Sequence, residues 1–256
     1  MIAPKKHLGQ HFLTDLGTAK RIADAILQIS GEADCVEVGP GKGVLTQFLL
    51  EGSKRDLYAV ELDRECIPYL HTHFKQENLH IIEADFLRMD LHALSGNPLV
   101  ICGNFPYNIS TEIVFKAIEN RTKVVGLCGM FQKEVAERLC APHGKKTYGI
   151  TSVITQTFFD TEYLFTVDEH VFNPPPKVKS GVMKMVLKTD FNLPVSEKQF
   201  IQVVKAGFNQ RRKTLRNALK SLSNADFSKV DEQVLNKRAE QLHWEEFVEL
   251  TERLFS

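Results

Sequence analysis

Several features of exported, membrane-bound and metal-binding proteins are missing from this 256-residue chain. No apolar run approaches the roughly 20 residues that a helix needs to cross a bilayer. The N-terminus lacks the apolar core and small-residue cleavage site of a signal peptide. The five cysteines are odd in number, widely separated and not in metal-ligand spacing. These absences predict a soluble cytoplasmic protein with reduced, buried thiols, no metal and no membrane partner.

The chain also lacks a net charge, because its 32 lysines and arginines balance 32 aspartates and glutamates. This balance argues against indiscriminate nucleic-acid binding, although charge can be segregated within a neutral chain. The hydrophobic share of 43% and the charged share of 25% match ordinary globular proteins. The sequence contains no internal repeat and no low-complexity tract. Its length therefore predicts one sizeable core with a small appendage.

From residue 35 onward, short β-rich runs alternate with segments of helical periodicity, which predicts a parallel sheet with helices on both faces. The predicted strands are Cys35–Gly39, Leu57–Leu62, His80–Glu83, Leu99–Gly103 and Val124–Phe131. The predicted crossover helices are Val44–Leu50, Arg64–Phe74, Thr111–Ile118 and Lys133–Leu139. A helix over Leu16–Ile29, capped by Thr14 or Asp15, precedes the first strand.

Two further strands are predicted at Tyr163–Val167 and Val178–Leu187. A proline-rich bend joins them, which indicates antiparallel pairing at one edge of the sheet. The fold class is therefore α/β, with a Rossmann-like, seven-stranded and mostly parallel sheet. The pattern after residue 196 is helical only, which predicts a small all-α C-terminal domain. We place the first domain at residues 1–190 and the second at residues 191–256.

The first predicted strand leads into a glycine-rich loop, residues 37–43, and then into a helix. The close spacing of Gly39 and Gly41 lets the backbone approach a ligand at a helix N-terminus, which suggests a nucleotide-like cofactor. A dinucleotide fingerprint requires a small residue where this chain has Val44, so dinucleotide binding is disfavoured.

Acidic residues lie at the end of the next strand and just after the one that follows it. Glu61 ends the second strand about 20 residues beyond the glycine loop, where a carboxylate can accept from both hydroxyls of a ribose. Asp85 follows the third strand and can accept from an adenine amino group while Phe86 or a neighbour packs against the ring. Each feature alone also fits a tight turn with solvated acids. Together, in strand order, they indicate binding of a nucleoside cofactor.

The fourth strand is followed by the loop Asn104 to Tyr107, at the strand end where α/β sheets bind ligands. An adenine amine is a poor nucleophile because its lone pair is delocalised, so a catalyst must hold its two hydrogens with acceptors. The Asn104 side-chain oxygen and the Phe105 carbonyl, freed by the following Pro106, are the expected acceptors. Tyr107 is placed to stack on an extruded base. The competing interpretation is a plain turn, since asparagine, proline and aromatics are common in turns.

The segment Lys205 to Lys220 contains no acidic residue, and its apolar residues recur at helical spacing. We expect a helix whose cationic face contacts RNA phosphates while Leu215 and Leu219 pack on the core. A solvated charged face is the alternative. The cations predicted to bind RNA are Lys5, Lys6, Arg211, Arg212, Lys213, Arg216 and Lys220, with Lys145 and Lys146 extending the track.

The chain resembles the ribosomal RNA adenine dimethyltransferase family in four motifs, which follow the family order and span the sequence. They are residues 7–13 (His-Leu-Gly-Gln-His-Phe-Leu), the Gly39 loop, Asn104 to Tyr107, and residues 172–180 (Phe-Asn-Pro-Pro-Pro-Lys-Val-Lys-Ser). The resemblance implies a class I fold that binds S-adenosylmethionine. It places around this cofactor His11, Leu13, Gly39, Glu61, Asp85 and Asn104. It also implies that Phe172 is a second stacking aromatic.

Within this family, the C-terminal part most resembles enzymes that dimethylate two adjacent adenosines near the 3′ end of small-subunit (16S) ribosomal RNA. The resemblance then implies that this RNA and the assembling 30S subunit are partners of a monomeric enzyme. The chain departs from the family at His11, where asparagine is usual, and at Phe105, where leucine is usual. Because position 11 is a histidine, we expect cofactor binding to depend mildly on pH near about 6.5.

Three alternatives remain open. An Erm-like enzyme that methylates large-subunit ribosomal RNA has nearly the same cofactor and adenine motifs, and the basic segment favours the small-subunit enzyme over it. A largely non-catalytic ribosome-assembly or RNA-binding factor is disfavoured by the intact Glu61, Asp85, Asn104 and Tyr107. A small-molecule methyltransferase is disfavoured by the adenine-type loop and the basic segment.

Overall fold

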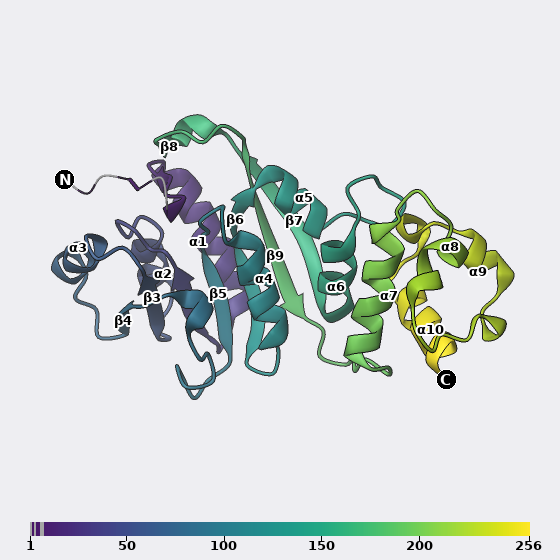
Figure 1. Cartoon of the computed structure of the whole chain (residues 1–256). Helices are drawn as coiled ribbons and strands as arrows, with labels where there is room; N and C mark the ends of the chain where they lie inside the picture. Colours follow the sequence, from purple (N-terminus) through teal and green to yellow (C-terminus); the bar gives the residue numbers. More distant parts are fainter. Residues whose placement is uncertain (1, 3, 6–7) are drawn as a thin grey trace. The chain divides into compact units, whose positions relative to one another are not determined.

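The computed structural model describes residues 2, 4–5 and 8–256. The chain divides into two compact units, which are coloured by sequence in Figure 1. The first unit consists of Met1–Ala136 and Thr161–Leu187, and the second of Glu137–Asp160 and Lys188–Ser256. The segment Glu137–Asp160 therefore joins the C-terminal helices rather than the sheet. The predicted boundary at residue 190 lies close to the second junction, and the two-domain assignment stays a prediction.

The first unit is built on the predicted seven-stranded sheet, with the strand order β4-β3-β2-β5-β6-β9-β7. The strands are β1 (Phe12–Leu13), β2 (Asp34–Val38), β3 (Leu57–Glu61), β4 (Leu79–Glu83), β5 (Leu99–Asn104), β6 (Val124–Gln132), β7 (Phe159–Val167), β8 (Phe172–Asn173) and β9 (Ser180–Leu187). The strands from β2 to β6 pair in parallel, whereas β9 pairs antiparallel with β6. This confirms the α/β class. Strands β9 and β7 are neighbours at one edge of the sheet, as predicted, and β9 runs antiparallel to β6.

The helices alternate with the parallel strands and then form the C-terminal part of the chain (Figure 1). They are α1 (Leu16–Ser30), α2 (Thr46–Gly52), α3 (Cys66–His73), α4 (Ser110–Glu119), α5 (Lys133–Leu139), α6 (Ile150–Phe158), α7 (Glu197–Asn209), α8 (Leu215–Ala218), α9 (Glu232–Asn236) and α10 (Trp244–Phe255). Short 3-10 helices are η2 (Phe86–Arg88), η3 (Glu169–Val171), η4 (Leu219–Ser221), η5 (Phe227–Lys229) and η6 (Ala239–Gln241). Among the described residues, no helix is both long and apolar enough to span a membrane.

The sheet is buried on both faces, as a parallel sheet between helices requires. The central strand β5 shows this, because Leu99, Val100, Ile101 and Cys102 are all fully buried. Helix α1 packs against β5, β6 and β9 through an apolar stripe that includes Ile22 and Ile26.

The predicted cap of α1 is also present. Its N-cap is Asp15, whose carboxylate accepts a hydrogen bond from the Thr18 N–H at 2.7 Å. None of the five cysteines is in a disulfide, and four of them are buried in the way that the composition suggested.

The C-terminal part of the second unit is helical, as predicted. Helices α7 and α10 pack together through fully buried side chains such as Phe200, Val203 and Phe247. These side chains recur at helical spacing, so each helix buries one apolar stripe.

The basic segment is not the single helix that its periodicity predicted, and that prediction is wrong. Helix α7 ends at Asn209, residues 210–213 form turns, and α8 begins at Leu215. In a continuous helix Arg212 and Arg216 would be like charges at i, i+4, which is unfavourable, and Asn209 is a weak helix former. Thr214 has extended backbone (φ −66°, ψ 156°). Leu215 is nevertheless fully buried, as predicted.

Candidate active site

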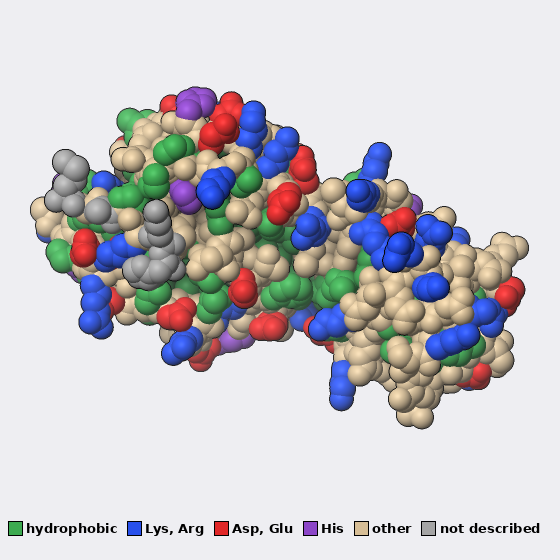
Figure 2. Space-filling model, turned by 45° about the horizontal axis from the view of Figure 1, so that its top comes forward, with side chains coloured by type: hydrophobic (Ala, Val, Ile, Leu, Met, Phe, Trp, Pro, Cys, Tyr) green, Lys and Arg blue, Asp and Glu red, His purple; other side chains and the backbone are tan. Residues whose placement is uncertain are grey.

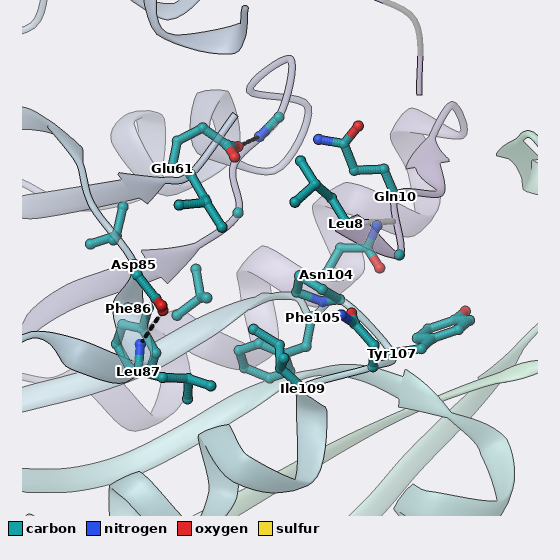
Figure 3. A pocket seen from close by; sticks show the side chains of 18 of the residues that line it. Leu8, Gln10, Glu61, Asp85, Phe86, Leu87, Asn104, Phe105, Tyr107 and Ile109 are labelled. Carbon is teal, nitrogen blue, oxygen red and sulfur yellow. Dashed lines mark hydrogen bonds between the residues drawn. The ribbon is translucent and has the colours of Figure 1, made fainter. Parts of the chain in front are cut away.

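A cavity of about 950 Å³, counted with its opening to solvent, lies at the carboxyl ends of β2, β3, β4 and β5 (Figure 3). The N-terminal segment at residues 8–12 forms another wall of the cavity. The sequence-predicted residues that line this cavity are His11, Gly39, Gly41, Glu61, Asp85, Asn104, Phe105, Pro106 and Tyr107. The fold therefore brings together motifs that are about 100 residues apart in the chain.

A smaller cavity of about 400 Å³ shares Phe12, Gly39 and Asn104 with the first and is also lined by Leu13. Phe172 is not among the described residues that line either cavity. Its side chain is 4% exposed and belongs to the core, where β8 pairs with β1. A stacking role for Phe172 stays a prediction, and it would require this side chain to leave the core.

Glu61 is held at the end of β3 by two backbone donors. The Gly41 N–H donates to Oε2 at 2.9 Å, and the Asp63 N–H donates to Oε1 at 2.8 Å. Burial raises the pKa of Glu61, and the two backbone hydrogen bonds oppose that change. Each carboxylate oxygen keeps a further lone pair, so the side chain fits the hydroxyls of a ribose.

The glycine loop makes this arrangement possible. Gly41 has φ +57°, and a Cβ atom there would lie 2.9 Å from the ring of Phe12. Only glycine adopts this backbone conformation freely and leaves space for Phe12. The N-terminal segment therefore packs directly on the loop that approaches the ligand.

Asp85 lies on the same side of the cavity as Glu61 (Figure 3). Its Oδ1 accepts from the Leu87 N–H at 3.0 Å, which caps η2, and the Arg88 Nε lies 3.4 Å from Oδ2. Phe86 is buried beside it and lines the cavity. A carboxylate next to an aromatic edge of the cavity fits an adenine with its amino group.

Asn104 and Phe105 present acceptors at the end of β5. The Asn104 Nδ2 donates to the His11 carbonyl at 2.9 Å, and no described residue donates to its Oδ1, the acceptor of the amide. The Phe105 ring is 1% exposed and packs 4.9 Å from the ring of Phe131, so its backbone is held firmly. Within the described part of the chain, the Phe105 carbonyl accepts no hydrogen bond.

Tyr107 lies at the far end of this loop. Its ring stacks on His11, with 5.5 Å between centroids and 28° between planes, and its hydroxyl lies 2.5 Å from the Ser180 Oγ. Burial raises the pKa of Tyr107, and the contact with Ser180 opposes that change. The His11 Nδ1 in turn lies 2.8 Å from the Pro174 carbonyl. The pH dependence expected from His11 stays a prediction.

A buried cluster that the sequence did not predict attaches the N-terminal segment to Asp63, two residues beyond the end of β3. The Asp63 carboxylate is buried and accepts from the Lys5 Nζ at 2.5 Å and from the Gln10 Nε2 at 2.9 Å. Burial alone would raise the pKa of Asp63, but these hydrogen bonds outweigh it and lower the pKa. The available signal was the position of Asp63, which follows the cofactor ligand Glu61 by two residues.

Lys5 therefore has an acidic partner within the protein, and its contact with RNA stays a prediction. Lys6 lies outside the described residues. No group of three or more metal-ligating side chains was found in the described ranges.

The predicted RNA-binding cations of the second unit fall into two groups. Arg211 pairs with Glu240 at 2.6 Å and donates to the Lys145 carbonyl at 3.3 Å, while Arg216 pairs with Glu232. The second group makes no ion pair with any described residue and is exposed. It consists of Arg212, Lys213 and Lys220. Figure 2 shows lysine and arginine side chains gathered over this unit.

The strand order, the glycine loop after β2, the acid at the end of β3 and the acid after β4 define a class I S-adenosylmethionine-dependent methyltransferase. Within that class, the chain belongs to the ribosomal RNA adenine dimethylase family, whose model matches residues 2–255.

Curated relatives cover almost the whole chain. A protein of Cytophaga hutchinsonii named ribosomal RNA small subunit methyltransferase A is 52% identical over 253 residues, covering 99% of this chain and 98% of that protein. A protein of the same name from Flavobacterium johnsoniae is 51% identical over 254 residues, covering 99% and 96%.

Solved structures agree on the fold. A dimethyladenosine transferase from Plasmodium falciparum has a TM-score of 0.77 at 25% identity and covers 94% of this chain and 96% of its own. The 23S rRNA methyltransferase ErmE has a TM-score of 0.74 at 22% identity, covering 96% and 100%, which supports the fold alone.

Proposed function

We propose that this chain dimethylates the N6 amines of two adjacent adenosines near the 3′ end of small-subunit ribosomal RNA, with S-adenosylmethionine as methyl donor. The observation that carries this proposal is the orientation of Asn104. Its Nδ2 is used by the His11 carbonyl at 2.9 Å, so Oδ1 is available to an amine in the cavity. The Phe105 carbonyl, from the next residue of the same loop, would be the second acceptor, since an adenine amine has two hydrogens to place.

The cavity fits the cofactor. Glu61 would bind the ribose hydroxyls, Asp85 would bind the adenine amino group, and the backbone at Gly39 and Gly41 would approach closely. When bound, S-adenosylmethionine supplies an electrophilic methyl group on a sulfonium.

The residues of the β5 loop would act on the target base. Asn104 and the Phe105 carbonyl hold the amine so that its lone pair is free to form the new bond to carbon. The N6 proton becomes acidic as that bond forms and leaves to water, so no strong base is required. Tyr107, and Phe172 if it moves out of the core, would stack on the extruded base. The same arrangement serves the second methylation of the same nitrogen.

The curated relatives are named as methyltransferases of the small ribosomal subunit RNA. Their names therefore support small-subunit RNA as the substrate over the large-subunit alternative. We propose the assembling 30S subunit as the partner, the cytoplasm as the location, and a monomer without metal as the active form. Residues 191–256 would serve as the RNA-binding domain. In that domain the exposed Arg212, Lys213 and Lys220 would meet RNA phosphates.

The test is methyl incorporation from labelled S-adenosylmethionine into under-methylated small subunits, large subunits and free adenosine, followed by mapping of the modified base. Dimethyladenosine in adjacent pairs near the 3′ end of the small-subunit RNA is the expected result. Label restricted to large-subunit RNA would favour the Erm-like alternative, and label in free adenosine would favour a small-molecule enzyme. A protein that labels none of the three would be a binding factor.

A further inference from the structure

The hydroxyl of Tyr107 points away from the part of the cavity where the cofactor is proposed to bind. Figure 3 shows the Tyr107 ring at the opposite end of the cavity from Asp85, with its oxygen directed away from Glu61 and Asp85. The hydroxyl instead lies 2.5 Å from the Ser180 Oγ, a contact between residues 73 positions apart. Stacking on a base needs an aromatic face but no hydroxyl. The hydroxyl therefore has another purpose.

Ser180 is a rigid partner for that hydroxyl. It is fully buried and is the first residue of β9, where it pairs with Gln132 of β6 in the sheet. Its Oγ therefore has a position set by the sheet rather than by a loop. Tyr107, by contrast, lies on a loop between β5 and α4. A hydrogen bond to Ser180 attaches the tip of the loop residue to the scaffold.

A second contact fixes the same ring from its face. His11 stacks on it with 5.5 Å between centroids, and the His11 Nδ1 meets the Pro174 carbonyl at 2.8 Å. The ring is therefore held at its tip by Ser180 and at its face by His11. Small displacements of groups that position a substrate are costly, and an error of about 1 Å can lower a rate by about 100-fold.

We propose that Ser180 is a positioning residue, which holds the Tyr107 ring through the hydroxyl contact in the plane where the target adenine stacks. This inference rests on the proposed function, because it needs a base to be stacked. It assigns the Tyr107 hydroxyl to anchoring and leaves proton transfer to water. It also explains why tyrosine rather than phenylalanine occupies position 107.

The first experiment is a double-mutant cycle with Ser180→Ala, Tyr107→Phe and the combined variant, each assayed on under-methylated small subunits. Each single change removes the same hydrogen bond, so each should lower kcat by about tenfold. The combined variant should lose no more than either single variant. The KM for S-adenosylmethionine should stay within about twofold of the wild-type value, because neither the Tyr107 hydroxyl nor the Ser180 hydroxyl contacts Glu61 or Asp85.

Two further variants separate positioning from folding. Ser180→Thr keeps the hydroxyl and should recover most of the lost turnover. Ser152→Ala removes a buried hydroxyl that donates to the Arg138 carbonyl in the second unit, so it should lower Tm without lowering kcat at a temperature where it is folded. In the double-mutant cycle of Ser180→Ala and Tyr107→Phe, the decrease in Tm of the combined variant should also be no larger than that of either single variant.

The outcomes are distinguishable. Additive losses in the combined variant, or full turnover in Tyr107→Phe, would overturn the inference while the wild type remains active. If Ser180→Ala does not fold, Tyr107→Phe and Ser180→Thr still decide it by the same criteria. A wild type that labels no RNA would contradict the proposed function itself, and the positioning role with it.

Discussion

The side-chain amide of Asn104 is held in the cavity by one hydrogen bond. Its Nδ2 donates to the His11 carbonyl at 2.9 Å and so sets the direction of Oδ1. Asn104→Ala removes that acceptor. We expect methyl transfer to fall by at least about 100-fold, in line with the loss of a single transition-state hydrogen bond. Cofactor affinity, measured by calorimetry, should change little.

A matched control is Asn120→Ala at the end of α4, which removes a similar bond from a side-chain amide to the Lys116 carbonyl at 2.8 Å. This variant should keep wild-type turnover. If Asn104→Ala instead lost cofactor affinity as strongly as turnover, Asn104 would be chiefly a cofactor ligand.

Glu37 makes the free energy of unfolding of the protein depend on pH. It is 1% exposed on β2, and burial, which outweighs the 2.6 Å hydrogen bond from the Thr46 hydroxyl, raises its pKa to about 7. The folded protein then holds a proton that the unfolded chain has released, so the free energy of unfolding decreases as the pH rises from about 4.5 to 7. The full effect is roughly 3 kcal/mol for this fully buried group.

Glu37→Gln should therefore raise Tm at pH 8 relative to the wild type and leave it nearly unchanged at pH 5. The glutamine oxygen can still accept from Thr46, so the packing is conserved. Glu51→Gln, an exposed change on α2, should leave the difference between the two pH values as it is in the wild type. Parallel Tm profiles for Glu37→Gln and the wild type would refute the role of Glu37.

At the scale of elements, β5 and β6 must approach closely beneath the catalytic loop. Gly129 on β6 faces Gly103 and Phe105, and a Cβ atom there would lie 2.3 Å from the Gly103 carbonyl and 2.5 Å from the Phe105 ring. Gly129→Ala should lower the free energy of unfolding by about 1–3 kcal/mol and displace the loop, so turnover also falls. Gly96→Ala is the control, because its Cβ would meet open space. Thermal unfolding measures the stability of each variant, and a methyl-transfer assay measures its turnover. If Gly129→Ala had the same Tm as the wild type, the expected steric clash of the new Cβ would be contradicted.

The elements that the sequence predicted well are those with one dominant pattern. The apolar run of β5 and the stripe of α1 agree with the structure, because burial on both faces or on one face leaves a clear periodicity. Helix α6 was missed, since Ile150–Phe158 is rich in β-branched residues that favour strands. Its packing against α7 and α10 decides the conformation instead.

The same limit applies to the site. Gly39, Glu61, Asp85 and Asn104 could be predicted because each lies at the end of a recognisable strand or just after it, and parallel strands end at one edge. Ser180 could not, because its partner Tyr107 lies 73 positions away and nothing local marks the pair. Contacts of this kind depend on tertiary structure alone.

On the scale of the whole molecule, recognition of RNA depends on how a chain without net charge distributes its cations. The exposed Arg212, Lys213 and Lys220 make no ion pair within the described part of the chain, whereas Arg211 and Arg216 already pair with acids. A cation that pairs within the protein has less to gain from a phosphate. The unpaired group should therefore supply most of the electrostatic affinity.

Replacing Arg212, Lys213 and Lys220 together by glutamine should weaken RNA binding uniformly and reduce the slope of log K against log salt by about 2–3. Cofactor affinity should not change. Lys198→Gln, an exposed change in the first turn of α7, should leave the slope within about 1 of the wild-type value. Arg211→Gln breaks the ion pair with Glu240, so it should lower Tm and change the slope little. Filter binding across a salt series measures each slope. A triple variant with the wild-type slope would mean that RNA phosphates meet a different surface.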